Sequence, residues 1–188
     1  VYIDEKLLGV INVDNVQEYN GFSKSDIEMM NYIKNELQLV LKNFIIKDKL
    51  SYMANFDELT GIYNRRRFKN ILANELNSIG KTQKKLCLAI IDIDDFKKIN
   101  DFYGHNVGDR ALQFFTHIMD VNIDEQNTYA RMSGDEFVVL FRNCEVQKIR
   151  EVLEGIRYKL SKEPFNDIRI SFSYGICEID KSKDMTMD

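Results

Sequence analysis

The first pattern along the chain is an apolar stretch followed by a long helical periodicity. Residues 7–14 (LLGVINVD) predict a strand that contains one glycine. Either Ser23 or Ser25 offers a hydroxyl that can cap the next run, in which apolar residues recur at helical spacing. The pattern therefore predicts a long helix over about 26–53.

Five apolar residues of this helix are spaced alternately three and four positions apart. They are Met30, Ile33, Leu37, Val40 and Phe44. This spacing is a heptad seam and is typical of a parallel dimeric stalk. An equally open alternative is that the helix packs on a sheet of its own domain. Leu41 and Ile45 add a second apolar face, so both contacts can coexist.

The rest of the chain alternates helical and strand patterns after a polar hinge. The order helix, strand, two helices, two strands, helix and strand predicts an α+β fold of the split-βαβ, ferredoxin-like kind. Its central antiparallel sheet would be flanked by helices. The predicted helices cover 65–78, 96–102, 109–121 and 146–161, with a loop at 103–108, and the predicted strands cover 86–94, 128–132, 136–141 and 168–179.

Composition narrows the classes of function. The chain has 188 residues, of which 44% are hydrophobic, and this is enough for one domain and part of another. A formal net charge of −4 argues against binding to a nucleic acid polymer. The longest apolar run, 86–91, is far shorter than the roughly 20 residues of a membrane span, so this segment is expected to make no membrane contact.

The cysteines and histidines point to carboxylates as the metal-binding groups. Cys87, Cys144 and Cys177 are widely separated and form no C-x-x-C pair, which indicates reduced core residues of a cytoplasmic protein. With only two histidines, Cys/His metal sites are disfavoured.

Acidic residues follow the predicted buried strand at 86–94. Asp92, Asp94 and Asp95 lie where a strand ends and a helix begins. Carboxylates there can hold Mg²⁺, helix N–H groups can bind phosphate, and Lys97 adds a cation. The alternative is a strand end with solvated acids and a capping aspartate.

A second acidic cluster lies in the tight turn at 133–136, Ser-Gly-Asp-Glu. Alone, it could be an ordinary acidic hairpin. If the two strands are neighbours, Asp92 and Asp135 point at one spot, with Asp94 and Glu136 near it. Four converging acids cannot all remain ionised without a cation, so the pair of motifs predicts a divalent metal site.

Two polar residues between the acidic motifs can recognise a guanine base. Asn100 offers an amide for the ring, and Asp109 can accept from the N1–H and N2–H₂ groups that adenine lacks. Each alone could be a helix cap, and His105 could simply stabilise its loop.

These motifs together resemble the GGDEF domain of the diguanylate cyclase family. The resemblance covers about 55–179 and rests on DELTGIYNRRRF (57–68), IDIDDFKKINDFYGHNVGD (91–109), RMSGDEF (131–137) and ISFSYGI (170–176). It implies a palm-type α+β domain, preceded by a long linker helix, that joins two GTP molecules into cyclic di-GMP and releases pyrophosphate. It also implies Mg²⁺ or Mn²⁺ as cofactor and a homodimer formed through the linker helix and for catalysis.

The resemblance assigns roles residue by residue. The metal ligands would be Asp92, the Ile93 carbonyl and Asp135. Asp135 or Glu136 would help to deprotonate the attacking 3′-hydroxyl, and Lys97 would stabilise phosphate charge. The substrate-binding residues would be Phe96, Asn100, His105, Asp109 and Gly134, and the hinge would be held by Asp57, Thr60, Asn64 and Arg65.

Three departures from the family pattern affect the expected activity. Ser133 replaces the first signature glycine, so the alternative is a degenerate domain that binds GTP or partners without turnover. Residues 124–127 lack the arginine of the family's product-inhibition motif, so no feedback site of that type is expected. The chain ends at Asp188, before the basic helix usual in the family, so weak turnover is expected of the sequence as given.

The resemblance also suggests a division into three segments. Residues 1–25 resemble the end of a GAF-like sensor domain, 26–54 form the linker helix, and 55–188 form the GGDEF domain. The principal function predicted is a sensor-regulated diguanylate cyclase. A third alternative is a dimerising signalling segment that acts through the seam.

Overall fold

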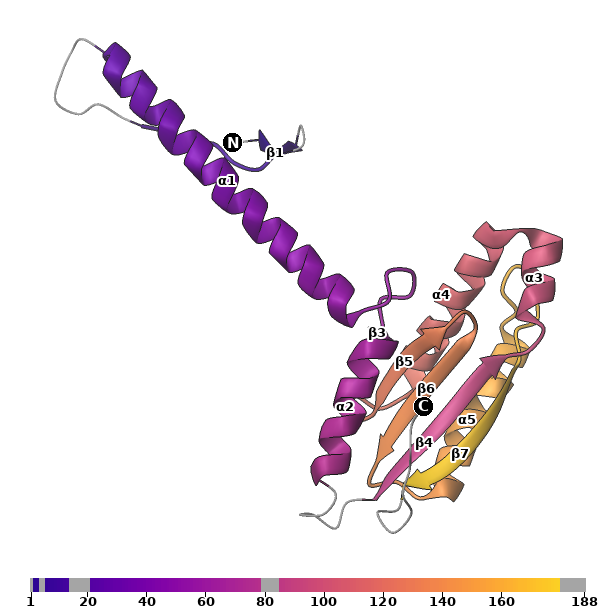
Figure 1. Ribbon diagram of the computed structural model, residues 1–188. Coiled ribbons are helices and arrows are strands. Elements are labelled where there is room, and N and C mark those ends of the chain that lie inside the picture. Colours follow the sequence, from indigo (N-terminus) through magenta and orange to yellow (C-terminus); the bar gives the residue numbers. More distant parts are fainter. Residues whose placement is uncertain (1, 4–5, 14–20, 79–84, 180–188) are drawn as a thin grey trace. The chain divides into compact units, whose positions relative to one another are not determined.

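The computed structural model describes residues 2–3, 6–13, 21–78 and 85–179. The chain divides into two compact units, Val1–Tyr52 and Met53–Asp188 (Figure 1). Each unit is described by itself below. Among the described residues, no helix has both the length and the apolar character that crossing a membrane requires.

The first unit consists mainly of helix α1, Lys24–Asn55, whose last three residues belong to the second unit. Its first turn is closed by reciprocal bonds with Ser23. The Asp26 N–H donates to Ser23 Oγ (3.2 Å), and the Ser23 N–H donates to Asp26 Oδ2 (2.8 Å). This is a capping box, and it selects Ser23 over Ser25 as the cap.

The strand predicted over 7–14 is wrong for most of its length. Strands β1 (Tyr2–Ile3) and β2 (Lys6–Leu7) form a short antiparallel pair. Residues 8–13 have no regular structure, and position 14 lies outside the described residues. An apolar run becomes a strand only when another strand satisfies its backbone groups, and no described segment pairs with 8–13.

The apolar seam of α1 lies at the surface of its unit. No residue of α1 is buried, and Val40 and Phe44 are 60% and 68% exposed. Met30 and Ile33 line a pocket together with Leu7, Val10 and Ile11 of the same unit. In the described part of the unit, the later seam residues Leu37, Val40 and Phe44 stay exposed and are free for another surface.

The second unit contains a five-stranded sheet in the order β3-β5-β6-β4-β7. Among the described strands of this sheet, β3 alone runs parallel to its neighbour, and the other pairs are antiparallel. The strands are β3 (Tyr63–Asn64), β4 (Leu86–Ile93), β5 (Thr128–Ser133), β6 (Glu136–Arg142) and β7 (Phe172–Ile179), and the helices are α2 (Arg65–Ser78), α3 (Phe96–Tyr103), α4 (His105–Asn122) and α5 (Val146–Lys162).

The predicted α+β fold, with a long helix before a sheet flanked by helices, is confirmed. The sheet is mixed rather than purely antiparallel, because the polar hinge contributes the two-residue strand β3. So short a strand leaves no alternation pattern in the sequence.

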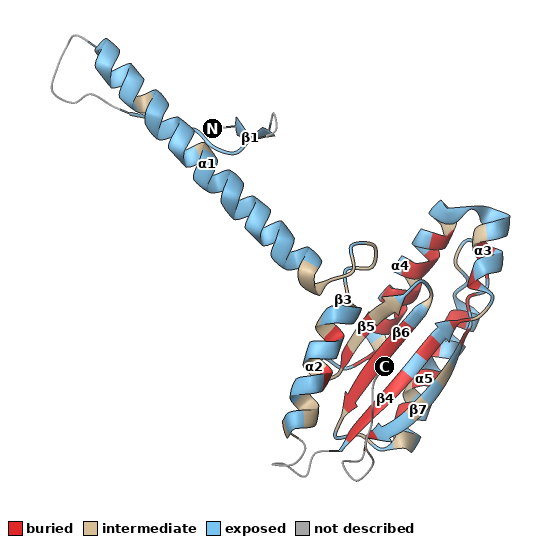
Figure 2. Ribbon diagram, viewed as in Figure 1, coloured by how far each residue is buried: buried red, intermediate tan, exposed pale blue. Residues whose placement is uncertain are grey.

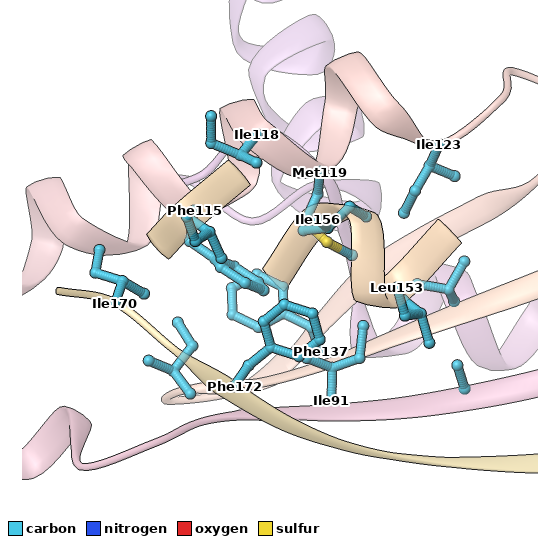
Figure 3. Close-up of a cluster of buried hydrophobic side chains, with 14 of the residues drawn as sticks. Ile91, Phe115, Ile118, Met119, Ile123, Phe137, Leu153, Ile156, Ile170 and Phe172 are labelled. Carbon is cyan, nitrogen blue, oxygen red and sulfur yellow. The ribbon is translucent and has the colours of Figure 1, made fainter. Parts of the chain in front are cut away.

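One face of the sheet is closed by α3, α4 and α5. Figure 3 shows the aromatic centre of this core, where the Phe115 ring lies 4.9 Å from Phe137 and 5.6 Å from Phe172, centroid to centroid. Ile91 and Phe137 are register partners here, and both are fully buried. These rings join helix α4 to the central strand β6 and to the edge strand β7.

The opposite face is covered over only part of its length. Phe68 and Leu72 of helix α2 form a buried cluster with the β4 residues Leu86 and Leu88. Figure 2 shows that strand β4 carries both buried and exposed residues. Farther along the same side of β4, Ile90 is 55% exposed, and Asp92 is exposed as well. The sheet therefore has a closed face and a half-open face, and β4 reaches the open half as it ends.

Two predicted boundaries shift for reasons of chain geometry. Helix α4 begins at His105 rather than at 109. The single residue Gly104 (φ 84°) makes the turn between α3 and α4, where the sequence predicted a loop over 103–108. Strand β7 begins at Phe172 rather than at 168, because its partner Ile93 is the last residue of β4.

Candidate active site

The end of β4 and the β5–β6 hairpin bring acidic residues together on the open half of the sheet. Asp92 lies directly opposite Glu136 in the register of β4 and β6. The N–H of Ile93 donates to the carbonyl oxygen of Asp135 (3.2 Å), which ties the strand end to the hairpin turn. The backbone thus places Asp92, Asp135 and Glu136 beside one another.

The three acids and Asp94 affect one another electrostatically. The pKa of Asp92 is raised above its usual range, first by partial burial and then by the negative charges of Asp135, Glu136 and Asp94, in that order. Like charges in adjacent positions disfavour the ionised state, and a cation among them removes the conflict.

The chemistry of this cluster fits a divalent cation. Among the described residues, no three acidic, histidine or cysteine side chains are arranged as a complete metal-binding group. The predicted set needs only two carboxylates, Asp92 and Asp135, together with the Ile93 carbonyl. Oxygen ligands of this kind suit Mg²⁺, and the negative charges of Asp135, Glu136 and Asp94 around Asp92 favour a cation there.

Asp94 does not join this cluster as closely as the sequence suggested. Its carboxylate accepts hydrogen bonds from the Ser171 and Ser173 hydroxyls, each at 2.7 Å. Its N–H donates to the Ser171 carbonyl (2.9 Å). Three bonds therefore hold Asp94 against the start of β7, where it anchors the turn into α3.

Ser133, the departure from the family signature, contacts a predicted catalytic residue. Its hydroxyl donates to Glu136 Oε2 at 2.6 Å across the hairpin. Gly134 has φ of 44°, a left-handed conformation that favours glycine in this tight turn. The serine side chain thus occupies one oxygen of the Glu136 carboxylate.

The predicted base-binding residues lie on the α3–α4 helix pair. Phe96 is buried at the start of α3, and Lys97 is exposed beside it. Asn100 is half-buried in the next turn, while His105 and Asp109 are exposed in the first turns of α4. Among the described residues, none of the polar side chains at 97, 100, 105 and 109 has a hydrogen-bond or ion-pair partner, so these polar groups remain available to a ligand.

The sequence analysis missed Gly108, which lies against Asn100. A Cβ atom at this position would overlap Asn100 Oδ1. A glycine inside a helical pattern, eight residues after an asparagine, was the only signal, and the predicted loop over 103–108 hid it.

The hinge is bonded to the acidic hairpin through another missed residue, Arg131. Its Nη1 pairs with Asp57 Oδ1 (3.0 Å), and its Nε donates to the Gly134 carbonyl (2.8 Å). Burial alone would raise the pKa of Asp57, but hydrogen bonds from Thr60 and Arg131 hold it below its usual value. The prediction that Asp57 and Thr60 stabilise the hinge agrees with these contacts.

Two further side chains close the hinge. Asn64 Nδ2 donates to the carbonyls of Met53 (3.1 Å) and Phe56 (3.2 Å). The Ala54 carbonyl accepts from Arg66 (2.6 and 2.9 Å), so Arg66 makes the contact expected of Arg65, which is exposed.

The fold and the acidic hairpin define an α+β domain with carboxylates gathered at one end of its sheet, and comparisons with known proteins identify its family. The family model described as "Diguanylate cyclase, GGDEF domain" matches residues 54–188. The chain therefore belongs to the GGDEF family.

Individual relatives agree with this family. The chain is 35% identical over 130 residues to the "Probable diguanylate cyclase DgcC" of Escherichia coli K12, covering 66% of this chain and 35% of DgcC. It is 31% identical over 120 residues to a "Diguanylate cyclase" of Vibrio cholerae, covering 64% and 37%. The chain thus spans about a third of the length of these curated relatives.

Solved structures share the fold. The coiled coil and GGDEF domain of Caulobacter crescentus DgcB, in complex with c-di-GMP, matches with a TM-score of 0.70 at 23% identity, covering 82% of this chain and 85% of that one. Diguanylate cyclase SiaD of Pseudomonas aeruginosa, in complex with its activator SiaC, matches with a TM-score of 0.65 at 26% identity, covering 84% and 62%.

Proposed function

We propose that this chain belongs to a diguanylate cyclase that condenses two GTP molecules into cyclic di-GMP. The observation that carries the proposal is the juxtaposition of Asp92, Asp135 and Glu136 at one end of the sheet, on the side that α2 leaves open. The half-buried Asn100 amide and the exposed Asp109 carboxylate, on either side of the Gly104 turn between α3 and α4, supply groups that complement guanine.

The reaction requires two nucleotides in opposite orientations. The 3′-oxygen of one GTP attacks the α-phosphorus of the other, and the bond to the departing pyrophosphate breaks. Asp135 or Glu136 accepts the proton from the hydroxyl, and Lys97 stabilises phosphate charge. A second, identical step closes the ring. Positioning and charge stabilisation supply most of the rate in such transfers.

The proposed metal site uses the cluster described above. Asp92, Asp135 and the Ile93 carbonyl would hold Mg²⁺ or Mn²⁺, which when bound neutralises charge on the phosphates. The substrate implies a compartment that contains GTP, so we place the activity in the cytoplasm. Phe96, His105 and Gly134 would complete the binding surface for the nucleotide.

The direct test uses the full-length protein with GTP and Mg²⁺. We expect pyrophosphate release, and mass spectrometry should identify cyclic di-GMP as the product. The Asp135→Ala/Glu136→Ala double variant should give no product while its circular dichroism spectrum stays unchanged. Product formation by the folded double variant would contradict the assignment.

A second candidate function is a module that binds GTP without turnover. The hydrogen bond from Ser133 to Glu136 favours it, because that bond occupies an oxygen that the reaction would use. GTP binding without pyrophosphate release by the full-length protein would support this candidate over the first.

We also propose that α1 pairs two copies and transmits a signal from a GAF-like domain represented by residues 1–25. Support comes from the exposed seam, in which Val40 is 60% exposed. Val40→Glu should halve the mass measured by light scattering. The control, Asn35→Glu, adds the same charge on another side of the helix and should leave the mass unchanged. If Val40→Glu also leaves the mass unchanged, pairing through the seam is refuted.

A further inference from the structure

The described helices contain two glycines, and they lie in contrasting surroundings. Gly155 in α5 is exposed, and a Cβ atom there would meet nothing within 4 Å. Gly108 in the first turn of α4 is buried, and its φ is not positive. Glycine costs a helix about 1 kcal/mol relative to alanine. The backbone conformation does not require glycine at 108, so the reason for it lies in its neighbours.

The space beside Gly108 is filled by two residues of the proposed nucleotide site. A Cβ atom at 108 would overlap Asn100 Oδ1, and it would lie 3.0 Å from Asn100 Cγ and 3.4 Å from Phe96 Cζ. The single-residue turn at Gly104 folds α4 back so that positions 100 and 108 touch. The missing side chain of Gly108 therefore makes room for the Asn100 amide.

Packing, rather than hydrogen bonding, positions this amide. Among the described residues, the Asn100 side chain has no hydrogen-bond partner, so both its donor and its acceptor remain available. Asp109 directly follows Gly108 in α4. A side chain at 108 would displace the amide and leave in place the backbone that carries Asp109, whose carboxylate we expect to read the other edge of the same base.

We propose that Gly108 is a positioning residue for guanine recognition, which acts by holding the Asn100 amide in its base-reading position. The proposal rests on the proposed function of the site. An alanine at 108 would push the Asn100 amide aside, and the fold would tolerate this because the displaced group is the end of a flexible side chain.

The test compares four variants of the full-length protein in Mg²⁺. The probe is guanosine 5′-(α,β-methylene)triphosphate, with its adenosine counterpart as the competitor base, and binding is measured by calorimetry. Gly108→Ala and Asn100→Ala should each lower the affinity for the guanosine probe by about 10- to 100-fold, which is the usual effect of losing one side chain–base contact. Binding of the adenosine probe should change little, so the preference for guanine falls.

The double variant separates positioning from other effects. If Gly108 acts through Asn100, Gly108→Ala should cost nothing further when Asn100 is already alanine. Gly155→Ala, the same change in an open part of a helix, should bind as the wild type does. Wild-type affinity in Gly108→Ala, or a further loss in the double variant, would overturn the proposal.

A measurement without nucleotide keeps this inference distinct from the function on which it rests. The side-chain amide resonances of Asn100 in an ¹⁵N spectrum should shift in Gly108→Ala and not in Gly155→Ala, while the unfolding temperature stays the same or rises. If the wild type binds no guanosine probe, the proposed function fails. Unshifted Asn100 resonances would refute the positioning role whether or not nucleotide binds.

Discussion

The two faces of the sheet differ in how completely helices cover them. On the closed face, Ile91 and Phe137 are register partners with no exposed surface. The residues next to these in the two strands, Asp92 and Glu136, are also register partners, and they lie on the open half of the other face. Adjacent residues thus serve different purposes, because successive side chains of a strand point to opposite faces.

The difference shows how this fold combines stability with chemistry. The closed face supplies buried apolar area, which holds the strands in register. The open half of the other face can then carry like charges that would destabilise a core. The carboxylates need no packing of their own, because the side chains packed on the closed face hold the strands that carry them.

The largest expected effect comes from breaking the closed face at its centre. Phe137→Ala removes a fully buried ring that packs on Phe115, and the free energy of unfolding should fall by about 3–5 kcal/mol. Its neighbour provides the control, because Glu136→Ala should change stability by no more than about 0.5 kcal/mol. Urea denaturation measures both, and similar losses in the two variants would contradict the division between the faces.

A smaller effect is expected from the serine beside the open-face carboxylate. Ser133→Gly and Ser133→Ala both remove the hydroxyl that donates to Glu136 Oε2. Each should raise the turnover of the full-length protein by up to about tenfold, the equivalent of one hydrogen bond. An increase in the glycine variant alone would show that the Cβ atom obstructs the site, and no change in either would show that the bond has no role in turnover.

The charge conflict at Asp92 should appear as a small pH-dependent loss of stability. Its pKa is raised in the folded chain, so the folded state binds this proton more tightly than the unfolded state does. Stability from this group is therefore lost as the pH rises from the ordinary value of 3.8 through the folded pKa.

Replacing this carboxylate tests that sign. Without divalent metal, Asp92→Asn should be slightly more stable than the wild type at pH 7, and the difference should vanish below pH 3.8. Adding Mg²⁺ should stabilise the wild type more than the variant. A variant that is less stable than the wild type at pH 7 without metal would show that Asp92 makes favourable contacts instead.

The smallest effect is expected at Ile90, an apolar residue on the open half. Because it is already 55% exposed, Ile90→Ser should shift the free energy of unfolding by no more than about 0.5 kcal/mol. Ile91→Ser serves as the matched control on the closed face and should be strongly destabilising. A large loss at Ile90 would mean that another surface covers this half of the sheet.

Local patterns were sufficient where a segment carries its own signal. The hydroxyls of Ser23 and Ser25 before a helical pattern, the apolar run of β4 and the periodicity of α2 and α5 gave elements close to those observed. Local patterns failed where the presence or absence of a pairing strand decides whether a segment becomes a strand. Residues 8–13 are apolar yet unpaired, and β3 exists only because β5 lies beside it.

The candidate site divides in the same way. Either acidic motif alone could have been structural, and the two were informative because they occur together in the order and spacing of the family signature. Arg131 and Gly108 were not visible, because their significance depends on residues 74 and eight positions away along the chain. Asp94 belonged to the motif by sequence, but Ser171, just before β7, and Ser173, within it, hold its carboxylate.

The sequence by itself determined the order of most elements, the acidic and amide groups that can serve a nucleotide, and the family to which they point. Spacing along the chain is enough for these, because propensity, turn chemistry and motif order are local properties. Only the tertiary structure decided which face of the sheet stays open, that Ser133 bonds to Glu136, and that Gly108 makes room for Asn100. Such contacts join residues whose distance in space depends on strand register and helix packing, which no local pattern encodes.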